Sequence, residues 1–329
     1  MCFQPTPVAD IIRASIPLAA TSTTLRTSVT VHSTHRWHCP ALFVISVGLL
    51  FSLDLLPVRA QDAPTAETKA SANPAAALPV YPLDSVVDKQ GTVITVDRNL
   101  PGLWNWQAEK LAVFVQGPKR FREPLNAVRS IALDHEGKLL VGDSSTRDIY
   151  RISEDGKATA ITGGQIGIPM DIAVKSDGTI YVADLELRKL MRIPAGSTKV
   201  EHVADVNPRG VFVDSQDKVW VVSQDAQQLL IVADDGAKEV VVDKRVFDFP
   251  HQVVVNSKGE AFVSDGYKKA IWKVIRGQAP AIVVAGPPLD NPVGLALYED
   301  QVIVTDPRAA KVMKLTSENK LEIWFEVKR

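Results

Sequence analysis

The stretch IPMDIAVKSDGTIYVADLELRKLMRI, from Ile168 to Ile193, is the clearest copy of a segment of about forty residues that occurs six times. Each copy has a short apolar strand, a polar turn that usually ends in Gly, a second apolar strand, a loop and a third strand. The residues that end the second strands lie 39 to 46 positions apart: Asp97, Asp143, Asp184, Ser223, Asp265 and Asp306. A repeat of this length cannot bury its apolar faces alone and must pack against its copies.

The strands of each copy are short and rich in β-branched residues. Runs such as IALDHEGKLLVGD (131–143) join two apolar segments through a tight polar turn, which is the pattern of a β-hairpin. A third strand (149–152, IYRI) and a fourth (157–162, KATAIT) complete the copy. Four antiparallel strands in about forty residues are typical of one propeller blade. We therefore predict an all-β fold over residues 81–329, a six-bladed β-propeller of four-stranded antiparallel blades. The predicted blades are 81–122, 125–162, 166–205, 206–243, 247–285 and 289–326.

The first eighty residues differ from the repeats. The apolar run 41–53 is too short to span a bilayer and suits the core of a secretory signal, so we predict a signal peptide over residues 1–60 with cleavage before Gln61. An uncleaved membrane anchor is the alternative. Residues 61–80 are rich in Ala, Pro and Thr and predict a flexible linker. We therefore expect a secreted or periplasmic protein.

Cysteine use and charge exclude several classes of function. Both cysteines, Cys2 and Cys39, precede the predicted cleavage site, so the mature chain has no thiol chemistry and no disulfide. The formal net charge is −1, and no basic run or aromatic-interleaved basic stripe occurs, which argues against nucleic acid as a partner. We expect a monomer without a membrane span in the mature chain.

The proline-led first strand at Pro169 and the sequence YVAD at 181–184 resemble the NHL repeat. The resemblance covers about residues 81–329 and implies a six-bladed propeller. It places the chain near a wider superfamily that includes the senescence-marker/gluconolactonase family, the peptidyl amidating lyases and strictosidine synthase-like proteins. NHL repeats are often binding scaffolds, and the fold itself does not select among these functions.

A propeller of this kind gathers its first strands around a channel, so we expect the ligand site at one channel mouth. The residues that follow the first proline of each blade, or its equivalent, are Leu83, Arg129, Met170, Arg209, His251 and Val293. Their next neighbours are Asp84, Ser130, Asp171, Gly210, Gln252 and Gly294. Arg129 and Arg209 are suited to a carboxylate or phosphate, with His251 as a further donor. Ser130 and Gln252 are the remaining binding candidates.

Two other readings of this ring stay open. In the first, Asp84 and Asp171 pair with the arginines and merely neutralise the mouth. In the second, they bind a divalent cation such as Ca²⁺, as the gluconolactonase resemblance implies. The triplets PMD, PRG, PHQ and PVG depart from that family's PNG and PDG pattern and put Arg209 where a cation would bind. We expect no cofactor outside this second reading.

We predict structural roles for the remaining histidines and the repeated aspartates. His135 lies in a hairpin turn and His202 on an outer strand, so they cannot join His251 around a zinc ion as in the amidating lyases. A carboxylate at a strand end commonly accepts backbone N–H bonds, and we assign that use to Asp97, Asp143, Asp184, Asp265 and Asp306.

Three hypotheses for function follow. The first is an exported binding module for a small anionic ligand or a protein partner at the channel mouth. The second is a metal-dependent hydrolase of the lactonase type with Asp84 and Asp171. The third is an interaction scaffold without a small-molecule site. No catalytic residue can be named from the sequence, and we favour a protein that is not an enzyme.

Overall fold

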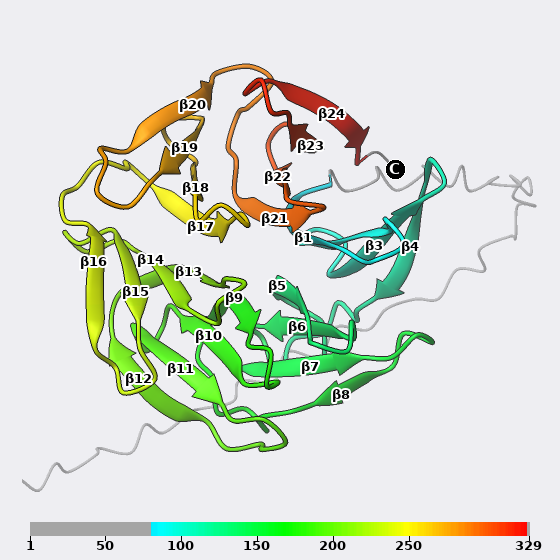
Figure 1. The fold of residues 1–329 in the computed structure, drawn as a ribbon. Helices are drawn as coiled ribbons and strands as arrows, with labels where there is room; N and C mark the ends of the chain where they lie inside the picture. The colour runs from blue at the N-terminus through cyan, green and yellow to red at the C-terminus, as the bar shows by residue number, and fades with distance from the viewer. Residues whose placement is uncertain (1–79, 328–329) are drawn as a thin grey trace, which may run out of the picture. The chain divides into compact units, whose positions relative to one another are not determined.

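The computed structural model describes residues 80–327, which form six four-stranded sheets arranged in a ring (Figure 1). The predicted signal peptide and all but the last residue of the predicted linker lie outside the described residues. Within the described range every regular element is a strand, and it therefore contains no helix that could cross a membrane.

The strands follow one another blade by blade. Blade 1 has β1 (Pro82–Val87), β2 (Val93–Asp97), β3 (Gly102–Gln107) and β4 (Lys110–Gln116). Blade 2 has β5 (Val128–Leu133), β6 (Leu139–Asp143), β7 (Asp148–Ile152) and β8 (Ala158–Ala160). Blade 3 has β9 (Pro169–Val174), β10 (Ile180–Asp184), β11 (Lys189–Ile193) and β12 (Glu201–Asp205). Blade 4 has β13 (Pro208–Val213), β14 (Val219–Ser223), β15 (Leu229–Val232) and β16 (Lys238–Val242). Blade 5 has β17 (Pro250–Val255), β18 (Ala261–Asp265), β19 (Ala270–Val274) and β20 (Ala281–Ala285). Blade 6 has β21 (Gly294–Tyr298), β22 (Gln301–Asp306), β23 (Lys311–Leu315) and β24 (Leu321–Glu326).

The predicted fold class is confirmed. Each sheet takes its four strands in sequence order from one repeat, and every pairing is antiparallel. The ring closes without an exchanged strand, through side chains of blades 1 and 6. The Ser85 and Thr305 hydroxyls are hydrogen-bonded at 2.8 Å, and Trp106 stacks on Phe325 with ring centroids 4.8 Å apart. Packing between the first and last blades therefore replaces backbone pairing as the seam of the ring.

The core is divided among the six interfaces between neighbouring blades. Each apolar cluster draws on two adjacent blades, including the cluster that joins blades 6 and 1 around Val93 and Ile303. The apolar residue six positions after each strand-ending residue is fully buried in all six blades: Leu103, Ile149, Leu190, Leu229, Ile271 and Val312. Fully burying a side chain of this size contributes about 1.5–3 kcal/mol, so the six repeats stabilise the ring at equivalent places.

The first two strands of each blade are joined by tight turns with a residue at positive φ. Gly178 holds this position in blade 3 at φ +88°, where an L-residue would be strained. In blades 4 and 6 the position belongs to Asp217 and Asp300, at φ 59° and 65°. Both aspartates use their side chains to contact the preceding blade, because Ser176 donates to Asp217 and Ser257 donates to Asp300. These turns thus also fasten neighbouring blades to each other.

Candidate functional site

The start of the first strand carries an extra residue in five of the six blades. In blade 2, Val128 pairs with Asp143 and Ser130 pairs with Gly142, which leaves Arg129 without a cross-strand partner. The same β-bulge occurs at Leu83, Met170, Arg209 and His251–Gln252. A bulge bends the strand and redirects a side chain, and bulges are common beside functional sites. In blades 2, 4 and 5 the bulge includes Arg129, Arg209 and His251, the three residues predicted to lie at the channel mouth.

Arg209 is held between polar and aromatic neighbours. Its guanidinium carbon lies 4.8 Å from the centroid of the Phe249 ring, within the range of a cation–π interaction. The side-chain oxygen of Gln224, in the amide orientation that satisfies both groups, accepts from Nε at 3.0 Å and Nη2 at 3.1 Å. Among the described residues Arg129 makes one side-chain hydrogen bond, from Nε to Ser144 Oγ at 3.3 Å. The two guanidiniums therefore keep donors for a further acceptor.

Neither arginine is neutralised within the described residues, where no carboxylate lies in salt-bridge range of Arg129 or Arg209. The acidic side chains in the loops of this face pair with other cations instead: Glu186 with Arg147, Asp225 with Arg188, Asp248 with Lys268, and Asp290 with Lys269. Burial lowers the pKa of Arg129, and the charge of Arg98 lowers it further. Burial and the charge of Arg129 likewise lower the pKa of Arg209. The mouth thus concentrates positive charge in a partly desolvated place.

His251 completes the group as a neutral ring. Burial, and secondarily the charge of Arg209, lowers the pKa of His251 to about 4. Its ring meets Phe249 edge-on, with centroids 5.0 Å apart, and Tyr267 stacks on Phe249 at 4.6 Å. The Nε2 atom has no hydrogen-bond partner among the described residues. Gly266 makes room for the ring, because a Cβ there would lie 2.9 Å from Nε2.

One residue further along the same strands, the side chains are buried and fully engaged. Asp84 is 3% exposed and accepts N–H bonds from Ser85 at 2.8 Å and from Ile131 at 3.2 Å. Asp171 accepts from Ile172 and Val211, each at 2.9 Å. The Gln252 amide donates to Asp171 Oδ1 at 3.1 Å, and its oxygen accepts from Leu295 N at 2.5 Å.

This carboxylate layer, formed by Asp84, Asp171 and Gln252, comes from blades 1, 3 and 5 and joins each of them to the next blade. Ser130, Gly210 and Gly294 hold the equivalent positions in blades 2, 4 and 6. A Cβ on Gly210 would meet the backbone of Gln252 at 2.7 Å, and a Cβ on Gly294 would meet Leu83 O at 2.8 Å. The alternation of long polar and small residues is therefore a packing requirement.

The two buried carboxyls hold protons more tightly than exposed ones do. Burial raises the pKa of Asp84 to about 7, although Gln252 and two backbone N–H groups act against the shift. Burial and the charge of Asp84 raise the pKa of Asp171 well above its ordinary value. At neutral pH a proton retained by one of the two carboxyls relieves their mutual repulsion.

These residues do not fit a divalent cation as they are arranged. Every carboxylate oxygen of Asp84 and Asp171 already accepts an N–H bond, and the Gln252 amide turns its donor toward them. Within residues 80–327 no third His, Cys, Asp or Glu joins the pair in a metal-binding group. Hard cations prefer six or more oxygen ligands, so we assign the pair no metal chemistry.

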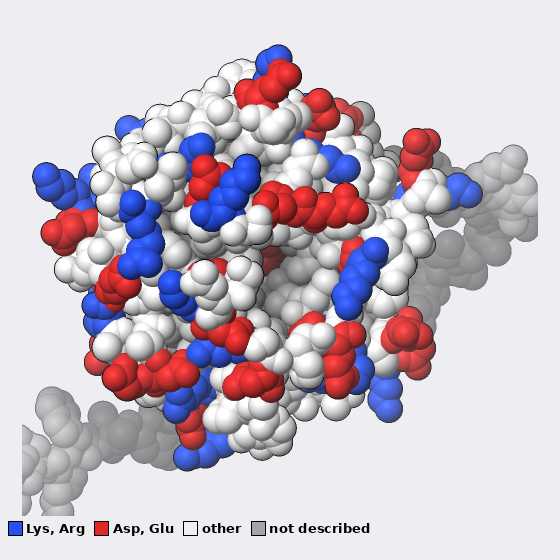
Figure 2. Space-filling model, viewed as in Figure 1, with Lys and Arg blue, Asp and Glu red and all other residues white. Residues whose placement is uncertain are grey.

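Asp84 and Asp171 of the carboxylate layer line one side of a cavity of about 250 Å³ along the axis. The other walls are mainly aliphatic and come from the first strands of the blades, including Val174, Val213 and Leu297. Figure 2 shows the ring hollowed at its centre, with charged side chains of both signs around the opening. The layer therefore separates this cavity from the arginine mouth.

The structure divides the sequence candidates between two levels. Arg129, Arg209 and His251 lie close enough at the mouth for their charges to interact. Gln252 belongs to the carboxylate layer, and Ser130 is fully buried, with its hydroxyl donating to Pro169 O at 2.9 Å. The predicted alternative in which Asp84 and Asp171 pair with the arginines is not what the described residues show.

The other predicted residues have structural surroundings. The repeated aspartates are fully buried and accept backbone N–H bonds from the start of their own blade and from the following turn, as Asp184 does from Gly167 and Leu187. The same holds for Asp97, Asp143, Asp265 and Asp306. His202 contacts Asp205 on the outer strand β12, and His135 lies on the turn face beside Gly178.

Sequence reasoning missed several mouth residues. Ser144, Gln224 and Gly266 each follow a strand-ending residue of the repeat, and the same alignment could have identified them. Phe249 and Tyr267 carry no repeat signal, because aromatic residues are not found at the equivalent positions of most other blades.

Comparisons with known proteins support the fold. No family model and no curated protein matches the sequence. Among solved structures, virginiamycin B lyase from Staphylococcus aureus is 14% identical with a TM-score of 0.57, over 76% of this chain and 85% of that one. A gluconolactonase from Xanthomonas campestris is 16% identical with a TM-score of 0.57, over 70% and 84%. A nidogen/laminin complex gives 16% and 0.58, over 74% and 90%. The predicted resemblance is thus confirmed as a likeness of fold, shared by enzymes and interaction proteins.

Proposed function

We propose that this propeller is a binding module for a small anionic ligand, held at the channel mouth by Arg129 and Arg209. The observation that carries the proposal is the lack of a carboxylate partner for either guanidinium within the described residues. The four acidic side chains in the loops of this face pair with other lysines and arginines instead. Two like charges held close together, with reduced access to water, are stabilised when an anion binds between them.

The surroundings of the arginines favour a carboxylate or phosphate over a simple halide. A guanidinium presents paired donors that match two oxygens of such a group. Gln224 and Phe249 fix the plane of Arg209, so less side-chain entropy is lost when the anion binds. Neutral His251 adds an apolar edge with one ring nitrogen rather than a third charge.

Binding, rather than hydrolysis, is the function that these residues support. The carboxyls that could serve a reaction lie in the layer below, where backbone groups and Gln252 already engage them. The nidogen/laminin complex is an example of a similar fold in a protein assembly, so we extend the proposal to an anionic group displayed by a partner protein. We also propose export through residues 1–60, which N-terminal sequencing of the mature protein would test.

The test is calorimetric titration of citrate and of sulfate into the wild type and the double variant Arg129→Gln/Arg209→Gln. We expect the variant to lose about 3 kcal/mol of binding free energy, roughly a hundredfold in Kd, because each guanidinium supplies charge-assisted hydrogen bonds. The matched control is Arg120→Gln/Arg276→Gln, which makes the same charge change at two exposed residues that pair with Glu123 and Glu239.

Two results would overturn the proposal. The first is unchanged affinity in the Arg129→Gln/Arg209→Gln protein. The second is an equal loss in the control, which would show that overall charge rather than the mouth attracts the anion.

A further inference from the structure

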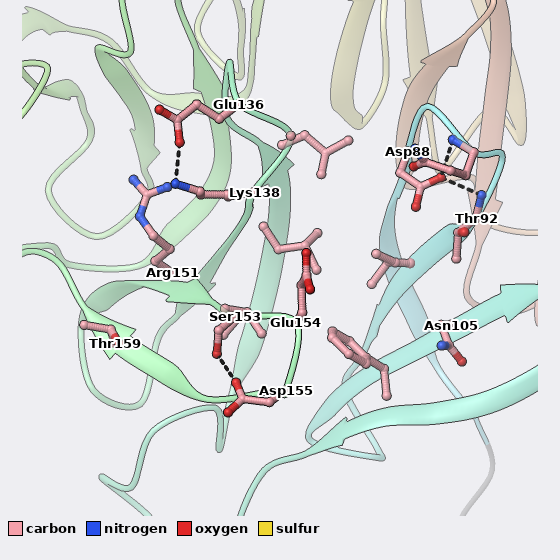
Figure 3. A pocket seen from close by; sticks show the side chains of 17 residues that line it. Asp88, Thr92, Asn105, Glu136, Lys138, Arg151, Ser153, Glu154, Asp155 and Thr159 are labelled. Atoms are coloured by element: carbon pink, nitrogen blue, oxygen red, sulfur yellow. Dashed lines mark hydrogen bonds and ion pairs between the residues drawn. The ribbon is translucent and has the colours of Figure 1, made fainter.

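A wide groove separates blades 1 and 2 on the face that carries the hairpin turns. It encloses about 940 Å³, at the upper end of the range for ligand pockets. Its floor is apolar and includes Ile94, Phe114, Leu139 and Ile152. The labelled residues of Figure 3 include acids on both banks, with Asp88 on the blade 1 side and Glu136, Glu154 and Asp155 on the blade 2 side.

The equivalent groove between blades 3 and 4 is filled by the chain itself. Lys175 lies there with its side chain only 13% exposed, and its Nζ contacts Asp234 Oδ1 at 2.5 Å. The Tyr181 hydroxyl donates to the same oxygen at 2.6 Å. A hollow of about 450 Å³ remains, half that between blades 1 and 2.

Alignment of the repeats shows which equivalent positions hold different residues in the two grooves. Nine positions before the strand-ending aspartate, blade 1 has Asp88 where blade 3 has Lys175. Three positions before it, Ile94 replaces Tyr181. The acid across the groove is kept, because Glu154 in blade 2 occupies the position of Asp234 in blade 4. Blades 1 and 2 thus retain the acid and lack the cation and the aromatic ring.

The acids of the groove keep free acceptors. Glu154 has no hydrogen bond or ion pair within residues 80–327. Asp88 Oδ1 accepts from Gln90 N and Thr92 N, while its Oδ2 has no partner in the same range. The two cations that line the groove are already used, since Lys138 pairs with Glu136 and Arg151 pairs with Asp134. The groove between blades 1 and 2 therefore carries unpaired negative charge, whereas in the groove between blades 3 and 4 Lys175 neutralises Asp234.

The described residues of blades 1 and 2 also lack the hydrogen bonds that join the hairpin turns of blades 3 and 4. Blade 4 contributes Asp217 to the contact with Ser176, whereas blade 2 has Gly137 at the same position. Together with the short outer strand β8, this leaves the groove open from the turns outward. The space is sufficient for the side chains that blades 3 and 4 supply internally.

We propose that this groove is a docking site for a basic segment of a partner protein. The segment inserts a lysine between Asp88 and Glu154 and lays a neighbouring aromatic side chain over Ile94 and Phe114. It thereby supplies the chemistry that Lys175 and Tyr181 supply between blades 3 and 4. The site is separate from the arginine mouth and takes the opposite charge.

The test uses the fluorescently labelled peptide Lys-Tyr-Lys-Tyr-Lys-Tyr and measures anisotropy with the full chain. The double variant Asp88→Lys/Ile94→Tyr transfers the blade 3 residues into blade 1 and should weaken peptide binding at least about tenfold by filling the groove from within. The single variant Glu154→Gln changes an exposed side chain, so folding is not at issue, and should weaken binding about fivefold. The same peptide with acetylated lysines should not bind.

The matched control is Glu318→Gln, which removes another exposed acid from a turn on the same face. Its affinity should stay within about twofold of the wild type. Citrate binding at the mouth should be unchanged in all three variants. The proposal is overturned if the wild type does not bind the peptide, if the double variant binds it as tightly as the wild type, or if Glu318→Gln and Glu154→Gln weaken it equally.

Discussion

The carboxylate layer and the arginine mouth are successive layers of side chains in the same channel, and they differ in whether the chain itself satisfies their ionisable groups. In the carboxylate layer, Asp84 and Asp171 are buried and bonded to backbone N–H groups and to Gln252. In the mouth one residue earlier, Arg129 and Arg209 stand near each other, and no carboxylate of the described chain pairs with them. Polar groups that the chain itself satisfies therefore stabilise the ring, whereas the two guanidiniums without a carboxylate partner among the described residues are available to a ligand.

The largest effect should come from the carboxylate layer. Gln252→Leu removes the acceptor of Leu295 N and the donor to Asp171, and it leaves both groups buried. We expect a loss of about 4 kcal/mol in the free energy of unfolding, measured by urea denaturation. The control Gln227→Leu changes an exposed glutamine and should stay within about 0.5 kcal/mol. Equal stability of the two variants would remove the distinction between the layers.

The second test uses pH. Because the pKa of Asp84 is raised to about 7, the folded state retains a proton that the unfolded chain releases near pH 4. This contribution to stability is complete at low pH and is lost as pH rises through about 7. Between pH 5 and 8 it amounts to about 3 kcal/mol.

The buried His251 acts in the opposite direction below pH 6.5, since its lowered pKa makes stability fall as pH falls. We therefore compare wild type and Asp84→Asn by denaturation at each pH, because the difference removes the histidine contribution. The wild type should lose stability relative to the variant as pH rises from 5 to 8. Parallel profiles would show that Asp84 titrates normally.

The third test addresses the mouth alone. Arg209→Lys keeps the charge but loses the planar contacts with Phe249 and Gln224. We expect citrate affinity to fall about fivefold while the free energy of unfolding stays within about 0.5 kcal/mol. A loss of stability comparable with that of Gln252→Leu would mean that the mouth is as structural as the layer beneath it.

The smallest effect should be the pH dependence of sulfate binding. His251 has a pKa of about 4 and stays neutral from pH 6 to 8. Sulfate does not titrate in this range, so its affinity, measured by calorimetry, should change less than about twofold. An affinity that rises steadily as pH falls below 7 would indicate that the imidazole becomes a third cation.

The fold could be predicted because its signal is repeated. Six aligned copies fix the phase of every strand, and the buried position represented by Leu190 recurs in each blade. The alignment also placed Arg129, Arg209 and His251 on one mouth. It could not show whether the arginines pair with Asp84 and Asp171, because that depends on the bulges, which turn adjacent residues to different levels.

The groove on the turn face shows the same limit. The exchange of Lys175 for Asp88 can be read from the repeats, yet its meaning depends on Glu154, which belongs to the next blade. A pattern within one repeat carries no information on which side chain of the neighbouring repeat lies opposite. Contacts across blades therefore required the structure.

In five blades the first strand begins with a bulged residue that has no cross-strand partner, and such a residue can be replaced without disturbing the sheet. Leu83, Met170 and Arg209 occupy equivalent places, although one is aliphatic, one a thioether and one a cation. Since none of them contributes to the ladder of its hairpin, substitution at these sites alters what the opening recognises while the sheet beneath keeps its register. New specificities could be selected from a library that varies only these few codons.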